Sequence, residues 1–292
     1  MSLLPACVCP SCPAHADTPS GSGCEVYPSS LTDEQWALLE GLLPPPRNRT
    51  GWGGRPEKHP RRRILDAVFY LVRAGVAWRY LPKGFPPWNT VYGFFARWRA
   101  DGTWLRVHDA LRDRVRVAAG RGPAPTAAII DSQSVRAAAT VGKHSRGFDG
   151  GKKVNGRKRH IAVDASGLLL VALVTVAGIQ DRDGGLRLLA LLRERFATVS
   201  LVWADGGYAG RLVSWVKRTL TITVEVVKRT DDHKGFKVVP RRWVVERTFA
   251  WLFTSRRLVH DYEGLPTNHE AMIHLSMILL MTRRLALTPK TP

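Results

Sequence analysis

The sequence predicts an α/β fold, in which a mixed sheet flanked by helices follows a small helical domain. Up to about residue 120, apolar residues recur at the three-to-four-residue spacing of amphipathic helices. From residue 126 onward, short apolar runs and helix-like segments follow each other in the order β-β-β-α-β-α-β-α-α. This order suits a mixed sheet with helices on its faces. The 292 residues suffice for about two domains.

Composition favours a folded protein with a polyanionic partner. Hydrophobic residues make up 45% of the chain and charged residues 23%, so the chain can bury a core. Lysines and arginines number 44 against 24 aspartates and glutamates, a net charge of +20 that attracts nucleic acid. Ribosomal and membrane-surface proteins share such a charge, so charge alone does not decide the function. No apolar run approaches the ~20 residues of a membrane span or forms a signal-peptide core.

Residues 1–26 are predicted to be a disordered tail rich in Pro, Ser, Gly and Cys. All four cysteines of the chain stand in it, at Cys7, Cys9, Cys12 and Cys24. With His15 between them, they suggest a zinc site, but their spacing matches no common zinc knuckle. A disordered extension is therefore favoured over zinc. So few cysteines exclude a disulfide-built fold and indicate a reducing, cytoplasmic setting.

Residues 27–120 are predicted to form a helical domain. Helices are expected after the capping residues Thr32 and Asp33, from about Arg61, from Asn89 or Thr90, and over Thr103–Ala119. The second and third, joined through residues 75–87, resemble a helix-turn-helix whose second helix carries Arg97 and Arg99 toward DNA phosphates. A helical bundle with a basic surface is the alternative.

Residues 121–292 are predicted to form the sheet domain. Expected strands cover residues 126–134, 159–163, 168–176, 201–204 and 222–227, and expected helices cover 184–196, 210–220, 241–253 and 268–285. Asp131 and Asp205 each follow a buried strand, and Glu246 lies on a helix. Two strand-end aspartates and a helix glutamate can hold two divalent metal ions for in-line attack at phosphorus.

Other interpretations of these acids stay open on the residues alone. An aspartate after a strand is commonly a turn residue or helix cap, and a glutamate beside arginines commonly forms a surface ion pair. Asp164, Asp181 and Asp183 also lie in loops and compete for the role.

Three motifs resemble those of bacterial insertion-sequence transposases of the insertion-sequence-five family. They are Ile-Asp-Ser-Gln-Ser-Val at 130–135, Ala-Asp-Gly-Gly-Tyr at 204–208 and Arg-Arg-Trp-Val-Val-Glu-Arg-Thr-Phe-Ala-Trp-Leu at 241–252. Further similarity covers residues 31–36, 78–82, 87–92, 151–160 and 180–184. The resemblance thus extends, in order, over nearly everything from Leu31 to Leu287.

The resemblance implies a ribonuclease H-like catalytic domain after a helical DNA-binding domain. Asp131, Asp205 and Glu246 would be its Asp-Asp-Glu site, holding two Mg²⁺ or Mn²⁺ ions. One ion would activate water, or later a DNA 3′-hydroxyl, and the other would stabilise the departing 3′-oxygen. Cleavage at the element ends and strand transfer into target DNA would be the same displacement with different nucleophiles. No zinc, nucleotide or redox cofactor is implied.

Basic residues around this site are predicted to contact DNA phosphates. They are Lys152, Lys153, Arg157, Lys158, Arg159 and His160, together with Arg242 one turn before Glu246. Double-stranded DNA is the expected partner, with a homodimer or larger assembly in the DNA complex. Location in the bacterial cytoplasm, at the nucleoid, is expected.

One departure from the family pattern concerns the flanks of Glu246. The family signature has Tyr seven residues before the glutamate and Lys seven after it, where this chain has Val239 and Phe253. If the helix continues, Arg257 lies on the same face and is predicted to supply the missing charge. A transposase remnant that only binds DNA, and a nuclease that cuts without joining, are the alternative functions.

Overall fold

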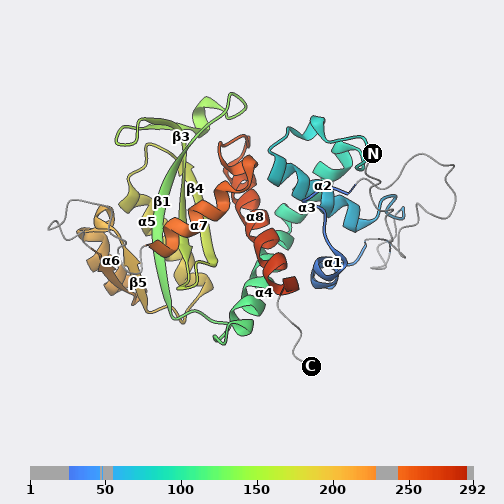
Figure 1. The fold of residues 1–292 in the computed structure, drawn as a ribbon. Coiled ribbons are helices and arrows are strands. Elements are labelled where there is room, and N and C mark those ends of the chain that lie inside the picture. Colours follow the sequence, from blue (N-terminus) through green and yellow to red (C-terminus); the bar gives the residue numbers. More distant parts are fainter. Residues whose placement is uncertain (1–25, 47, 49–54, 228–242, 288–292) are drawn as a thin grey trace, which may run out of the picture.

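The computed structural model describes residues 26–46, 48, 55–227 and 243–287 (Figure 1). The cysteine-rich tail and Arg242 lie outside these ranges. Within them, no helix combines the length and the apolar character needed to cross a bilayer.

Four helices form the first half, close to where the apolar spacing predicts them. They are α1 (Asp33–Glu40), α2 (Arg61–Ala74), α3 (Trp88–Ala100) and α4 (Thr103–Ala118). Thr32 caps α1, and its side chain and that of Gln35 form a reciprocal capping box. α2 ends at Gly75, which adopts the left-handed conformation that glycine tolerates best. The predicted helices are confirmed.

A six-stranded mixed sheet forms the second half. Its strands are β1 (Ala127–Arg136), β2 (Gly147–Asp149), β3 (Val154–Val163), β4 (Leu169–Val176), β5 (Leu201–Ala204) and β6 (Thr223–Val226). The order is β2-β3-β1-β5-β6, and β4 also pairs with β3. β3 runs antiparallel to β1 and β4, whereas β5 and β6 run parallel to β1. The mixed sheet is confirmed, while β2 and the first half of β3 were not predicted.

Helices cover both faces of this sheet. α5 (Asp181–Arg195) and α6 (Arg211–Leu220) pack on one face, and α7 (Trp243–Phe253) and α8 (Pro266–Leu287) lie against the other (Figure 1). Because successive side chains of a strand point to opposite faces, the side chains of β1 divide between these two layers of helices. Ala128 and Ile130 join the core beneath α5 and α6, and Ile129 joins the core beneath α7 and α8.

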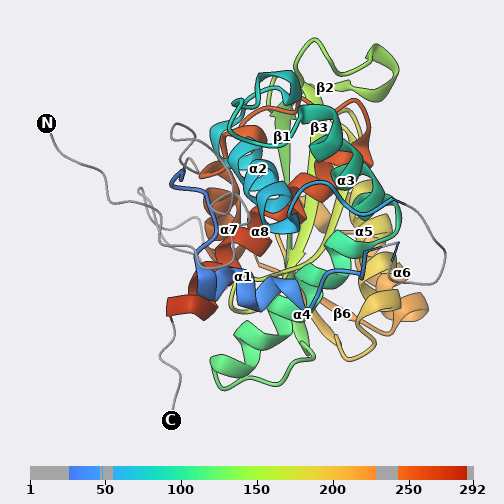
Figure 2. The ribbon, with the colours of Figure 1, turned by 90° about the vertical axis from the view of Figure 1, so that its right-hand side faces the viewer.

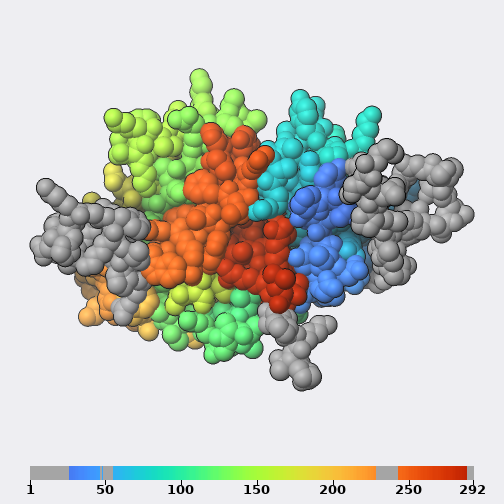
Figure 3. Space-filling model, in the orientation of Figure 1, coloured from blue at the N-terminus to red at the C-terminus, as the bar shows by residue number. Residues whose placement is uncertain are grey.

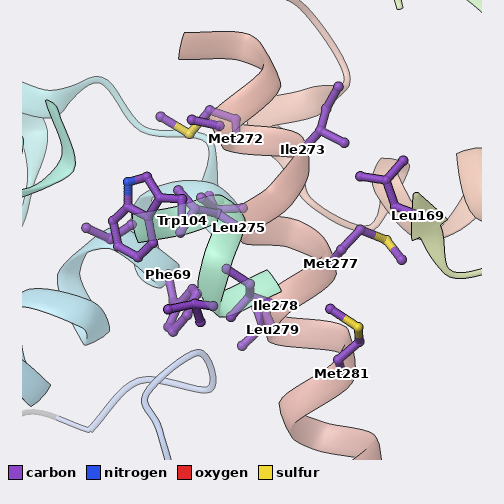
Figure 4. Packing of buried hydrophobic residues seen from close by; sticks show 14 of the residues in the cluster. Phe69, Trp104, Leu169, Met272, Ile273, Leu275, Met277, Ile278, Leu279 and Met281 are labelled. Atoms are coloured by element: carbon purple, nitrogen blue, oxygen red, sulfur yellow. The ribbon is translucent and has the colours of Figure 1, made fainter. Parts of the chain in front are cut away.

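The helices of the first half share a core with α8. Phe69 of α2, Trp104 of α4 and Leu169 of β4 belong to the same buried cluster as the apolar residues of α8 (Figure 4). Viewed from the side, α2, α3 and α4 lie in front of the sheet (Figure 2). On the surface, α7 and α8 separate the strands from the first helices (Figure 3). Residues 27–120 therefore do not close a core of their own, and the division at residue 120 stays a prediction.

One close approach at the start of α5 gives a stability prediction. A Cβ atom on Gly184 would lie 2.1 Å from the ring of His160, whose side chain is fully buried. Replacing Gly184 with Ala is expected to lower the free energy of unfolding by about 1–3 kcal/mol, the usual cost of overpacking. Gly93→Ala on α3, where an added Cβ meets nothing within 4 Å, is the control. It is expected to stabilise by about 0.4–1 kcal/mol. Equal denaturant midpoints for both variants would contradict this packing.

Candidate active site

The two predicted aspartates stand at equivalent positions of neighbouring parallel strands. β1 and β5 pair Ala127 with Leu201 and Ile129 with Trp203, so paired residues differ by 74 in number. Asp131 and Asp205 are separated by the same interval, two residues beyond the last pair. β5 ends at Ala204, one residue before Asp205, whereas β1 continues to Arg136, so Asp131 lies within its strand. Extended by two residues, the β1–β5 register brings Asp131 level with Asp205.

The third carboxylate reaches the same face of the sheet from α7. Residues two apart on a strand share a face, so Asp131 points to the side on which Ile129 packs, under α7 and α8. Glu246 lies in the first turn of α7 and is exposed. Asp131 and Glu246 line one pocket of about 550 Å³. Its remaining lining residues are Ser132, Gln133, Ser134, Lys152, Phe249, Ala250 and Phe253.

Asp205 stands directly before a short turn. Its backbone is extended, and its Oδ1 accepts a hydrogen bond from the Gly207 amide at 2.9 Å, capping a 3₁₀ turn. Tyr208 at the end of this turn is fully buried. Burial, followed by the charges of Asp131, Asp181 and Asp205, raises the pKa of the Tyr208 phenol well above its ordinary value. The phenol is therefore neutral near pH 7.

The donor set fits a hard divalent cation in kind. Carboxylate oxygens are the ligands that Mg²⁺ and Mn²⁺ prefer, and here they come from β1, from the residue after β5 and from α7. They are not gathered around a common point: in the described part of the chain, no three His, Cys, Asp or Glu side chains lie close enough to hold a metal ion. Asp131 and Glu246 share the pocket, whereas Asp205 is not among its lining residues.

A buried charge network supports β1 from behind. Ser132 donates to Asp181 Oδ1 at 2.8 Å, and the Lys158 ammonium donates to the same oxygen at 2.8 Å. Although burial opposes ionisation, the hydrogen bonds from Lys158 and Ser132 lower the pKa of Asp181. Lys158 also pairs with Asp149 at 3.4 Å. Asp181 is thus a supporting residue, a role that sequence reasoning missed although Ser132 stands directly after Asp131.

The aspartate of the β3–β4 turn has a structural role. Asp164 is fully buried, accepts from the amides of Ser166 and Leu168, and pairs with Arg116. A carboxylate engaged in this way holds a turn and is closed to substrate. Asp164 therefore does not compete with Asp131.

Three of the predicted DNA contacts on β3 are buried, which contradicts their assignment. Arg157 and Arg159 are each 1% exposed and Lys158 is 5% exposed. Arg157 pairs with Asp261 at 3.0 Å, and Arg159 donates to the Leu258 carbonyl at 3.0 Å. The physical reason is the place of β3, which lies between β1 and β4 with helices over both faces.

His160 is also closed to DNA. It lies on β3 and is fully buried, with Nε2 3.1 Å from the Thr175 hydroxyl. Burial lowers the pKa of His160 to about 4. The imidazole is therefore neutral near pH 7 and offers no charge to a phosphate.

The prediction for Arg257 is wrong. α7 ends at Phe253, and the Thr254 hydroxyl donates back to the Trp251 carbonyl, a bond that competes with helix continuation. Arg257 is 6% exposed, and its guanidinium pairs with Glu263 at 2.8 Å. It therefore stabilises the loop between α7 and α8 and does not face the pocket.

Two predicted DNA contacts remain accessible. Lys152 and Lys153 are exposed in the turn between β2 and β3, and Lys152 lines the pocket. On α3, Arg97 is exposed, whereas Arg99 donates to Thr267 of α8 at 2.9 Å. Of these two arginines, Arg99 therefore helps to pack α3 against α8, and Arg97 faces the solvent.

Comparison with known proteins identifies similar families for both halves. Residues 122–281 match the family described as "Transposase DDE domain", and residues 31–108 match "Putative transposase of IS4/5 family". Two proteins of Burkholderia cepacia are similar in sequence. The "Insertion element IS402 uncharacterized 16.2 kDa protein" is 35% identical over 37% of this chain and 73% of its own length. The "Putative transposase for insertion sequence element IS402" is 34% identical over 43% of this chain and 62% of its own length.

Proposed function

Because the chain belongs to the transposase DDE-domain family, of the insertion-sequence IS4/5 type, we propose that it binds the ends of its own element, cleaves them and joins them to target DNA. This family comprises enzymes that cut and transfer DNA. The observation that carries the proposal is the shared interval of 74 residues between the β1–β5 register and the two aspartates. This interval supports our placement of Asp131 beside Asp205, and Asp131 and Glu246 line one pocket.

We assign the catalytic centre to these three carboxylates. Asp131, Asp205 and Glu246 would hold two Mg²⁺ or Mn²⁺ ions, which, when bound, activate the attacking oxygen and stabilise the leaving oxygen. Ser132 and Asp181 keep β1 in place behind Asp131. Phe249 and Phe253 form an apolar wall of the pocket.

The proposed chemistry consists of two displacements at phosphorus. In cleavage, a water oxygen forms a bond to phosphorus and the bond to the 3′-oxygen breaks, leaving a 3′-hydroxyl and a 5′-phosphate. The water loses a proton and the leaving oxygen gains one. In strand transfer, that 3′-hydroxyl attacks a target phosphodiester, so one ester bond forms as another breaks and no energy source is needed.

The DNA would run across the exposed basic residues beside the pocket. Lys152 and Lys153 are proposed phosphate contacts, as is Arg242, four residues before Glu246 in the sequence. The first helices, with Arg97 exposed on α3, are the proposed end-binding segment. Synapsis of two ends requires at least a dimer in the DNA complex. We propose that the protein acts in the bacterial cytoplasm, at the nucleoid.

A strand-transfer assay tests this function. A labelled duplex carrying an element end is incubated with the full chain, plasmid target and Mg²⁺ or Mn²⁺. The proposal expects metal-dependent cleavage at the end, and joining of a pre-cut end with a free 3′-hydroxyl. Cleavage without joining would identify a nuclease, and end binding without either reaction would identify a remnant that only binds DNA. Both results would contradict the proposal.

A further inference from the structure

One basic side chain lines the pocket among its described residues. It belongs to Lys152, whose ammonium lies 3.3 Å from the carbonyl oxygen of Ser132, the residue after Asp131. The other polar walls include the carboxylates of Asp131 and Glu246. A phosphate that entered between two carboxylates would meet net negative charge, and Lys152 is placed to offset it.

The turn between β2 and β3 is built to hold Lys152 in this place. Oδ1 of Asp149 accepts hydrogen bonds from the Gly151 amide at 3.1 Å and the Lys152 amide at 3.0 Å. Lys153, the next residue, has a φ of +52°, a left-handed conformation that non-glycine residues rarely adopt. Strain of this kind persists where the surroundings impose it, and it commonly marks functional sites.

Asp149 is itself held by two side chains of neighbouring strands, Ser134 of β1 and Lys158 of β3. Its Oδ2 accepts from the Ser134 hydroxyl and lies 3.4 Å from the Lys158 ammonium. Although burial opposes ionisation, the hydrogen bonds from Ser134 and the Lys152 amide lower the pKa of Asp149 to about 2. The charged anchor of the turn is thus tied to β1, the strand that carries Asp131.

We propose that Lys152 contacts the phosphate under attack in the active site, and that Asp149 is the positioning residue that directs it there. This inference rests on the proposed transposase function. The ammonium would donate to a non-bridging phosphate oxygen, where negative charge grows as the nucleophile attacks. Its neighbour Lys153 carries the same charge but does not line the pocket, so it would serve DNA affinity alone.

The first experiment separates binding from the chemical step. Single-turnover cleavage of an element end is measured at saturating DNA for Lys152→Ala and Lys153→Ala, with thermal unfolding as a check on the fold. Loss of one charge-stabilising donor costs about 10²–10³-fold in rate. Lys152→Ala is expected to lose rate on this scale and Lys153→Ala far less, while Lys152→Arg regains part of the loss. Equal rates in the two alanine variants would overturn the proposal.

The second experiment reads out binding without cleavage. The linkage cut by the wild-type protein is replaced with an uncharged methylphosphonate, and affinities are compared in the absence of divalent metal. The wild-type protein is expected to lose affinity about tenfold, as for one charged hydrogen bond. For Lys152→Ala, replacing the charged linkage with the neutral one should cause no further loss of affinity. Lys153→Ala should lose affinity by the same factor as the wild-type protein. Equal losses in all three proteins would refute the contact.

A cycle of variants tests the role of Asp149. If Asp149 acts by directing Lys152, then Asp149→Ala, which removes the acceptor of both turn amides, and Lys152→Ala should lower the cleavage rate by similar factors, and the double variant should fall no further. A double variant whose loss of rate equals the product of the two single losses would show that Asp149 acts independently of Lys152. Failure of the wild-type protein to cleave any end would contradict the proposed function, whereas cleavage with an insensitive Lys152 would contradict this inference alone.

Discussion

Replacing Arg157 with Ala is expected to destabilise the fold by about 3–5 kcal/mol, the scale of a broken buried ion pair. The Arg157 side chain donates to Asp261 and to the carbonyls of Glu263 and Gly264. Asp261 is fully buried, so removal of the guanidinium would leave a carboxylate that neither water nor a full set of donors stabilises. Chemical denaturation of both proteins measures the effect.

The control for this variant is Lys153→Ala. Lys153 stands four residues earlier and is exposed, so its loss should change stability by less than about 0.5 kcal/mol while weakening DNA binding. A surface DNA contact at position 157 would give the opposite pattern. An Arg157→Ala protein with unchanged stability and reduced DNA affinity would show that Arg157 faces the DNA.

The second large effect concerns catalysis. Asp131→Asn, Asp205→Asn and Glu246→Gln are each expected to reduce cleavage by ~10⁴-fold or more, the scale measured when an essential catalytic side chain is lost. Each change keeps the size of the side chain and removes the charge that a divalent cation requires. DNA binding should persist, because phosphates are held by lysines and arginines. Both properties are measured on the same labelled end.

An aspartate outside the site provides the matched control for these variants. Asp183 is exposed in the first turn of α5 and does not line the pocket, so Asp183→Asn should cleave at the wild-type rate. Cleavage retained in one of the three site variants would remove that residue from the centre. Loss of end binding together with cleavage would indicate misfolding in place of a chemical defect, and thermal unfolding distinguishes the two.

The sequence predicted the helices and most of the sheet because their apolar patterns are local. Thr32 with Gln35 marks the start of α1, and the run before Asp131 marks a buried strand. The carboxylate assignment came from the resemblance of three motifs to the insertion-sequence-five family, whereas the relative placement of Asp131 and Asp205 depends on a long-range property, the pairing of β1 with β5. Local patterns do not give register, and here the 74-residue interval agrees with it.

The basic residues of β3 were predicted to contact DNA, and they are buried instead for a physical reason. A run of charged residues usually indicates a solvent-exposed segment, because burying an unpaired charge is costly. Here the charges are compensated by acids distant in the chain, Arg157 by Asp261 and Lys158 by Asp181. A single sequence carries no signal for these pairs, because they form only when the loop after α7 and the start of α5 are placed against β3.

The pair Arg256 and Arg257 shows the limit of extending a helix from its pattern. Arg256 is exposed and Arg257 is buried, the reverse of what a continued helix face predicts. Thr254 and Ser255 end α7 through hydroxyl contacts, with the Ser255 hydroxyl 2.8 Å from that of Ser276. The sequence held a sign of this end, since Thr and Ser favour helix termini over helix interiors.

The metal dependence of cysteine variants tests whether Asp131, Asp205 and Glu246 are ligands of one metal centre. A thiolate is a softer ligand than a carboxylate and suits Mn²⁺ better than Mg²⁺. Cleavage of a labelled element end is measured in each metal for Asp131→Cys, Asp205→Cys and Glu246→Cys. If all three carboxylates bind the metal, we expect no cleavage in Mg²⁺ and partial recovery in Mn²⁺. Full activity in Mg²⁺, or no Mn²⁺ recovery in any of the three folded variants, would contradict this assignment.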